Sequence, residues 1–212
     1  MRQKIKSYLV FTSRGYRLVM FALVPLLLAA LQAFFLKKME GSAIPLIIMF
    51  LTAAEIMGDN WFLGGIQEKN AEKIDYLKTS GRGMKVMENA LIMDFVRRFL
   101  TAAAIFGICD LLSRLLGGED EFRGLGIWLF SVLTSYSLSA LGTFFARFGS
   151  YLWINILISY FTAAVGIVCC LLLMFDVSPW IFSVLLAVLG AGISVLAVKI
   201  AMRKVKGGYY DK

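Results

Sequence analysis

The stretch QEKNAEKIDYLKTSGRGMKVMENALIMDFVRR, residues 67–98, is a long polar insert between two strongly apolar segments. It carries seven basic residues: Lys69, Lys73, Lys78, Arg82, Lys85, Arg97 and Arg98. Basic residues collect in the cytoplasmic loops of membrane proteins, so this pattern predicts that the insert faces the cytoplasm. The sequence also predicts a short polar helix over residues 69–78, a break at residues 81–83 and a second helix leading into the next apolar segment.

The composition is typical of a polytopic membrane protein. Of the 212 residues, 59% are hydrophobic and only 17% are charged, which leaves too little charge for the surface of a soluble domain. The net charge of +8 comes from basic residues at the ends of apolar segments. This placement indicates membrane topology and argues against nucleic-acid binding. The chain has no His, and Cys109, Cys169 and Cys170 lie in apolar runs, so we expect neither a disulfide framework nor a metal site.

Six apolar segments have the length of about 20 residues that a helix needs to cross a bilayer. They cover residues 18–36, 44–66, 99–116, 125–146, 151–175 and 179–201. We therefore expect an all-α fold, a single transmembrane domain over residues 1–212 with six membrane-spanning helices. An even number of spans puts both termini on one side. All but four of the 22 Lys and Arg residues fall on that side, which predicts a cell-membrane protein with both termini in the cytoplasm.

The N-terminal residues 1–17 contain five basic residues and an apolar helical face made of Ile5, Tyr8, Leu9 and Thr12. Such a segment predicts an amphipathic helix that lies in the cytoplasmic interface of the bilayer. A disordered basic tail that only sets the orientation of the chain is the alternative.

Small residues recur every four positions in two of the expected spans. They are Ser131, Ser135, Ser139 and Thr143 in the fourth span, and Thr162, Gly166 and Cys170 in the fifth. This spacing lets helix backbones approach closely, so ordinary helix packing explains it. A hydrated path or a seam between two chains is the functional alternative.

Three acidic residues in the spans are candidates for a translocation path, because a charge near the bilayer centre costs at least ~2.5 kcal/mol. Glu55 is near the middle of the second span, and Asp59 follows one turn later on the same face. We expect both to face the bundle interior or a seam between chains, with Glu55 neutral and needing no cation beside it. Asp110 lies in the third span, one turn before Arg114. The structural alternative pairs Asp110 with Arg114 and leaves Glu55 protonated or hydrogen-bonded to another span.

The sequence offers no catalytic constellation. Without His there is no His-based triad, and no G-x-x-x-x-G-K-[ST] loop is present to hold a nucleotide. We therefore expect no enzyme activity and no cofactor in this chain. If it works on a substrate, the energy comes from a gradient or from another subunit.

The sequence combines four features: an amphipathic N-terminal helix, six spans with both ends inside, a cytoplasmic insert between spans two and three, and the tight inner turn ARFGS (residues 146–150). In this combination the chain resembles the permease subunits of type-2 ATP-binding-cassette exporters. In that family the insert has a Glu-containing lead, a short Leu-rich helix, a Thr/Ser-Pro step and a basic entry into span three. The corresponding residues here are Glu68 or Glu72, residues 74–77, Thr79 with Ser80, and residues 82–93. Gly81 stands where Pro is common.

The resemblance implies a half-transporter that pairs with a second copy or a paralogue, while separate ATPase subunits bind ATP and Mg beneath it. The coupling helix that contacts the ATPase would consist of Lys73, Ile74, Asp75, Tyr76, Leu77, Lys78, Thr79 and Ser80. Closure of the ATPases would switch the spans from inward to outward access. The implied function is export of a hydrophobic or amphipathic substrate such as a peptide, a lipid or a drug.

Two other functions remain open from the sequence. A gradient-driven carrier, or a membrane-embedded substrate-binding subunit, would use Glu55, Asp59 and Asp110 as proton or cation sites. A membrane scaffold or immunity protein would use the insert to dock a partner and would transport nothing.

Overall fold

A computed structural model describes residues 2–39, 41–67, 79–80, 82–116, 124–148, 157, 160–161, 164 and 179–206. Within these ranges all regular structure is helical, which confirms the expected fold class. The elements are α1 (Arg2–Phe11), α2 (Arg14–Leu18), the π-helical turn η1 (Val19–Leu23), α3 (Val24–Lys38), α4 (Ile44–Gln67), α6 (Gly83–Leu116), α7 (Leu125–Phe148) and α9 (Pro179–Lys206).

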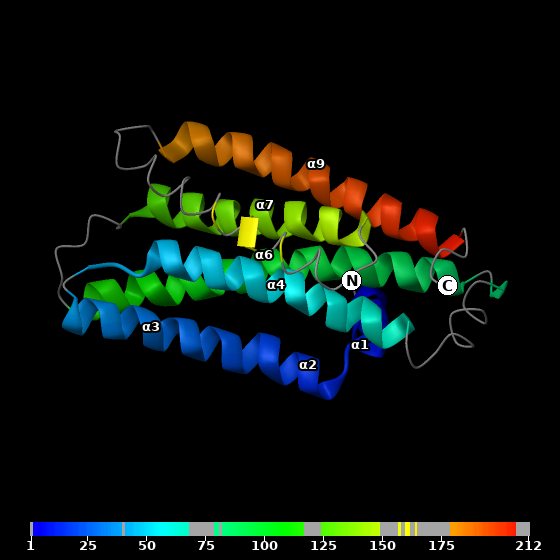
Figure 1. Cartoon of the computed structure of the whole chain (residues 1–212), viewed down its shortest axis with the longest axis horizontal. Coiled ribbons are helices and arrows are strands. Elements are labelled where there is room, and N and C mark those ends of the chain that lie inside the picture. The colour runs from blue at the N-terminus through cyan, green and yellow to red at the C-terminus, as the bar shows by residue number, and fades with distance from the viewer. Residues whose placement is uncertain are drawn as a thin grey trace.

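The long helices α3, α4, α6, α7 and α9 run side by side as one elongated bundle (Figure 1). The end of α3 lies at one end of this bundle, together with the starts of α4, α7 and α9. The start of α2, the end of α4, the start of α6 and the end of α9 lie at the opposite end. We call this second end the link end, because residues 67–83 connect α4 to α6 there.

Among the described residues, four helical segments are long and apolar enough to cross a membrane: Arg14–Lys38, Gly83–Leu116, Leu125–Ala146 and Trp180–Arg203. They overlap the first, third, fourth and sixth expected spans, and the third begins sixteen residues earlier than expected. The second expected span coincides with α4, which packs in the same bundle. The fifth expected span, with its stripe of small residues, falls almost wholly outside the described part of the chain. In the part of the chain that the structure describes, the fold is thus all-helical with four candidate spans, and the total of six stays a prediction.

The first of these spans is continuous despite a proline near its start. Pro25 has no backbone N–H, so the usual helical hydrogen bond to the carbonyl of Phe21 cannot form. The chain responds with the π-helical turn η1 directly before α3, and α2, η1 and α3 together still form one rod. The proline therefore adjusts the helix without ending it.

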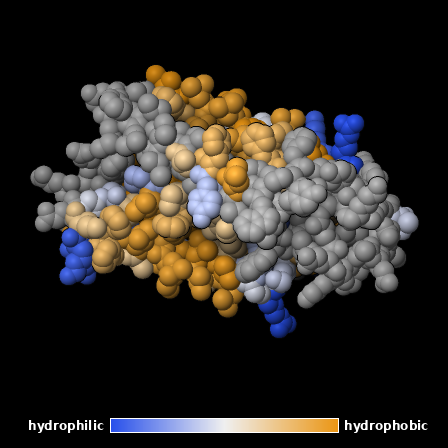
Figure 2. Space-filling view, in the orientation of Figure 1, coloured by the Kyte–Doolittle hydropathy of each residue, from blue (hydrophilic) through white to orange (hydrophobic). Residues whose placement is uncertain are grey.

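The polarity of the bundle is that of a membrane protein. Hydrophobic side chains cover much of the visible face, and strongly hydrophilic ones lie mainly toward its two ends (Figure 2). Leu26 and Leu27 of α3, and Val184 and Val188 of α9, are exposed. In contrast, the interior holds polar side chains from several helices, among them Gln32, Thr52, Ser113, Ser131, Thr134, Ser135, Ser139, Thr143 and Ser183. Apolar side chains outside and polar ones inside suit helices surrounded by lipid.

Helices α7 and α9 pack especially closely, and the reason lies at Gly190. A Cβ atom at this position would lie only 2.6 Å from Ser137 Oγ. That hydroxyl donates a hydrogen bond to the carbonyl of Leu186 at 2.7 Å, and the hydroxyls of Tyr136 and Ser194 are 2.8 Å apart. The four small residues expected to form a stripe in the fourth span are all buried, as helix packing requires.

The basic N-terminal segment forms two helices and not one. Ser13 separates α1 from α2, and its Oγ accepts a hydrogen bond from the backbone N–H of Tyr16 at 3.1 Å. Helix α1 packs mainly on α6 and also contacts α4. Its Tyr8 ring stacks on Phe62 with ring centroids 5.8 Å apart. The alternative of a structureless tail is therefore wrong, and part of the face expected to dip into lipid packs on protein instead.

Candidate functional site

Five charged side chains meet in the interior of the bundle, and we call them the charge network. Glu55 and Asp59 come from α4, while Asp94, Arg97 and Arg98 come from α6. Their exposed fractions do not exceed 5%. Residues three or four positions apart share a helical face, so the two acids of α4 point to one side and the three charges of α6 point to one side. The two faces lie opposite each other.

Arg97 joins the two helices through a two-pronged contact with Glu55. Its Nη1 donates to Glu55 Oε1 at 2.9 Å, and its Nη2 donates to Glu55 Oε2. On the other edge of the guanidinium, Nε and Nη2 donate to Asp94 Oδ1 at 3.2 and 3.1 Å. Bidentate pairs of this kind are the strongest ion pairs because they fix both distance and orientation.

Arg98 extends the network to a third helix. Its Nε donates to Asp94 Oδ2 at 2.8 Å, and its Nη2 donates to Asp59 Oδ1 at 3.0 Å. Its Nη1 donates to the hydroxyl of Thr143 in α7. Asp94 thus binds Arg97 with one oxygen and Arg98 with the other, and the network fastens α4, α6 and α7 to one another.

Aromatic rings cover the network on the side of the N-terminal helices. The Tyr16 ring centroid lies 5.8 Å from Arg97 Cζ, a distance typical of a cation–π contact, and Phe95 lies 5.2 Å from Arg98 Cζ. The hydroxyls of Tyr8 and Tyr16 are buried beside this part of the network. Burial raises the pKa of Tyr8, which lies in α1 outside the candidate spans, to about 12. Its hydroxyl is therefore neutral at physiological pH.

A buried network of this kind favours one fixed arrangement of its helices over intermediate arrangements. Charges are expensive to bury, and they are tolerated here because each is paired with an opposite charge. Removing one partner of a buried pair typically costs about 3–5 kcal/mol, since the remaining charge has neither water nor a counter-ion. The three helices are thus held in one arrangement, and intermediate displacements that stretch the ion pairs are unfavourable.

The structure confirms one expectation about the acidic pair of the second span and corrects another. Glu55 and Asp59 face the bundle interior, as expected. However, the expectation that Glu55 needs no cation beside it is wrong, because both of its oxygens bind Arg97. Assigning Arg97 and Arg98 to a water-exposed insert was wrong too, since α6 runs without a break from Gly83 to Leu116 and buries both side chains.

A signal for this arrangement was present in the sequence. Hydropathy alone treats two consecutive arginines as the polar end of a span. Yet Asp94 precedes Arg97 by three positions and Arg98 by four, which puts all three on one helical face. The acids of the preceding span have the same four-residue spacing. Two complementary faces in neighbouring helices predict pairing, and this comparison finds the arginines that hydropathy misses.

Asp110 does not belong to the charge network. It lies 13 residues beyond Arg97 on the same helix, about 20 Å further along the helix axis. Its Oδ2 is 2.9 Å from Arg114 Nη2, and the Arg114 side chain is 65% exposed. The expected local pair of Asp110 with Arg114 is therefore present, and a role of Asp110 in a translocation path stays a prediction.

The expected coupling helix lies mostly beyond the described residues, which include only Thr79 and Ser80 from its range of 73–80. The carbonyl of Ser80 accepts a hydrogen bond from the backbone N–H of Gly83 at 3.0 Å, at the start of α6. The assignment of residues 73–78 to an ATPase contact stays a prediction.

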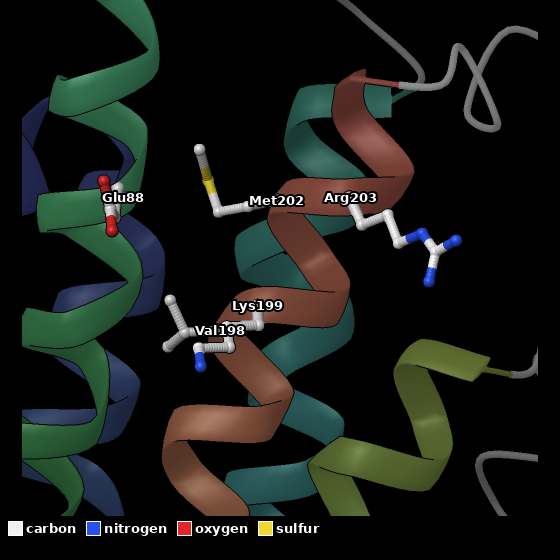
Figure 3. A pocket seen from close by; sticks show the side chains of 5 residues that line it. All are labelled: Glu88, Val198, Lys199, Met202 and Arg203. Atoms are coloured by element: carbon white, nitrogen blue, oxygen red, sulfur yellow. The ribbon is translucent and has the colours of Figure 1, made fainter.

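A cleft of about 330 Å³ opens at the link end between α6 and α9. Figure 3 shows Glu88 on α6, with Val198 and Met202 reaching toward it from α9, while Arg203 points away. Glu88, Lys199 and Arg203 are exposed, so the cleft has charges of both signs beside an apolar floor. Such a surface suits contact with a protein.

No protein-family model, no curated protein and no solved structure matches this chain.

Proposed function

We propose that this chain is the membrane-spanning permease subunit of an ATP-binding-cassette exporter, which moves a hydrophobic or amphipathic substrate out of the cell. One observation carries the proposal. The two helices that flank residues 67–83, α4 and α6, are joined by the buried pairs of Glu55 with Arg97 and of Asp59 with Arg98. A soluble partner that pushes on residues 67–83 would therefore act on α4 and α6 together, because the ion pairs hold these two helices in one arrangement.

The distances suit such a transmission. Gln67 is twelve residues from Glu55, and Gly83 is fourteen residues from Arg97. At 1.5 Å per residue, the network lies roughly 20 Å from the link along each helix. Since Arg98 also binds Thr143, a displacement of the link would move α4, α6 and α7 as one body. Rigid-body motion of this kind is the usual basis of a change from inward to outward access.

The substrate path is proposed to lie between two chains. The cavities beside α1 and between α6 and α9 measure about 210 and 330 Å³ and open at the surface of the bundle. Pockets for drug-sized ligands measure about 300–1,000 Å³ and enclose most of the ligand. A second copy or a paralogue would complete the path, as the family resemblance implies.

The partner ATPase would bind at the link end. It would meet the insert, and the cleft with Glu88, Lys199 and Arg203 would add a second contact with charges of both signs. In this arrangement the ATPase supplies the ATP and Mg site that the sequence of this chain lacks. The link end would face the cytoplasm, because the basic residues of α1, α2 and the end of α9 gather there.

The test is reconstitution with a partner. The chain would be co-expressed with ABC-type ATPases from the same genome, beginning with neighbouring reading frames, and the complex placed in proteoliposomes. We expect ATP hydrolysis stimulated by a hydrophobic peptide or dye, and ATP-dependent accumulation of that compound. Asp75→Lys and Leu77→Glu in the insert should remove most of the stimulation, while the spans still insert. Lys38→Glu, at the opposite end of the bundle, is the matched control and should leave stimulation unchanged.

Two outcomes would reject the exporter. Full substrate-stimulated hydrolysis with the insert variants would show that the insert does not couple the two subunits. Transport that persists without any ATPase and stops when a protonophore collapses the proton gradient would favour the carrier, with Glu55 and Asp59 as its proton sites.

A further inference from the structure

A groove of about 210 Å³ opens on the outer surface between α1, η1 and α6. Ile5 and Leu9 of α1, Phe21 of η1, and Val96 and Leu100 of α6 form its apolar walls. These five side chains are between 37% and 58% exposed. These side chains belong to three separate elements. The groove is therefore a hollow between packed helices, and not simply the exposed apolar face of one helix.

The groove lies at the level where basic and apolar residues meet. Phe21 follows Arg17 by one helical turn, and Arg17 is the last basic residue before the apolar part of the first span. On α6, Leu100 comes two residues after Arg98, where the apolar stretch of the third span begins. In a membrane, this transition corresponds to the boundary between lipid headgroups and acyl chains.

The N-terminal segment, which supplies Ile5, Leu9 and Phe21 to the groove, carries positive charges only. Residues 2–39 contain seven Lys and Arg residues and neither Asp nor Glu. Lys4 and Lys6 are exposed on α1, on either side of Ile5, and Arg14 is exposed on α2. On the α6 side, Arg97 is already bound to Glu55 and Asp94, so it is not free to bind another anion.

We propose that this groove binds an acyl chain of an anionic phospholipid, whose phosphate headgroup contacts the basic residues of α1 and α2. The volume is smaller than the about 300–1,000 Å³ of a pocket for a drug-sized ligand, so the groove holds part of a chain and not a whole substrate. A bound lipid would clamp α1 to α6 beside the charge network. The proposal needs only a membrane around the chain and does not depend on export.

Lipid retention measures this directly. The purified chain is placed in bilayer discs made of equal parts phosphatidylglycerol and phosphatidylcholine, and bound lipid is counted by native mass spectrometry after release. We expect one retained phosphatidylglycerol per chain. Leu100→Trp fills the groove and should abolish retention. Leu111→Trp, on an exposed position of the same helix, is the matched control and should retain the lipid.

A second pair of variants tests the headgroup. Each basic residue near an anionic surface contributes about fivefold to affinity, so Lys4→Gln with Lys6→Gln should weaken phosphatidylglycerol binding about 25-fold. Lys37→Gln with Lys38→Gln removes the same charge at the opposite end of the bundle and should have no effect. These exposed substitutions leave the helical core intact, which circular dichroism checks.

Three results would overturn the proposal. Equal retention of phosphatidylcholine and phosphatidylglycerol by the native chain would remove the role of the basic residues. Retention that survives Leu100→Trp would place the lipid elsewhere. Equal losses with both lysine pairs would show general attraction to the membrane surface and no site.

Discussion

Replacing Arg98 by methionine tests whether the charge network holds the bundle together. Methionine has a similar apolar stem and removes only the guanidinium, which is 1% exposed and binds Asp59, Asp94 and Thr143. Loss of one partner from a buried ion pair costs about 3–5 kcal/mol. We expect a loss of that size, because two carboxylates lose a shared partner at the same time.

The free energy of unfolding can be measured by titrating sodium dodecyl sulfate into mixed micelles and following helix content by circular dichroism. Arg114→Met is the matched control. This arginine lies on the same helix and also pairs with an aspartate, but it is 65% exposed. Exposed pairs contribute about 0–1 kcal/mol, so the control should change stability several times less than Arg98→Met.

A double substitution separates the pair from the individual residues. Asp59→Leu removes the carboxylate that Arg98 binds on α4, so adding it to Arg98→Met should recover part of the loss. We expect an interaction energy of about 1–3 kcal/mol, as found for residues in direct contact. A loss below about 1 kcal/mol for Arg98→Met, or strict additivity of the two changes, would refute the view that buried charge pairs fasten α4 to α6.

Three further substitutions test Glu55 of the charge network, the packing of α7 on α9, and Tyr8 of α1. Glu55→Gln keeps an acceptor for Arg97 and should support assembly better than Glu55→Leu, and assembly and export by Glu55→Leu equal to those of the native chain would leave Glu55 without a role. Gly190→Ala should lower stability by about 1–3 kcal/mol, because the new Cβ meets Ser137 Oγ, whereas Gly192→Ala on the same helix meets open space and should not. Tyr8 has a pKa near 12, above its ordinary value of 10.0, so its contribution to stability is complete below pH 10 and falls as the pH rises toward 12. Tyr8→Phe should remove that part of the alkaline dependence, measured as the unfolding free energy between pH 9 and pH 11.5, and an unchanged dependence would contradict the assignment.

The sequence predicted the apolar helices well, because their length and composition depend on local residues. The expected second span of residues 44–66 and the observed α4, Ile44–Gln67, agree almost residue for residue. The expected break at residues 81–83 and the helix that leads from it into the third span agree with α6, which begins at Gly83. The extent of the polar insert was predicted less well. Hydropathy began the span at Phe99, but Asp94, Arg97 and Arg98 before it are buried by pairing, and that depends on tertiary contacts.

For the same reason, the sequence predicted the two acids that α4 contributes to the candidate site but not the two arginines of α6. Glu55 and Asp59 stood out because isolated acids inside a span are costly. Arg97 and Arg98 did not, because they lie at the edge of a polar insert and look like ordinary flanking charges. The grooves beside α1 and between α6 and α9 could not be predicted at all, since each is lined by elements far apart in the chain.

The charge network also sets the order in which the chain can enter a membrane during synthesis. Helix α4 emerges from the ribosome before α6, so Glu55 and Asp59 exist for a time without Arg97 and Arg98. At the level of the network, near the boundary between headgroups and acyl chains, each acid costs less than the about 2.5–3.5 kcal/mol that the insertion scale gives for the bilayer centre. The unpaired acids still make insertion of α4 alone less favourable. Helix α4 should therefore remain beside the insertion machinery until α6 arrives, and the two should pass into lipid together, with the arginines of α6 paired to the acids of α4.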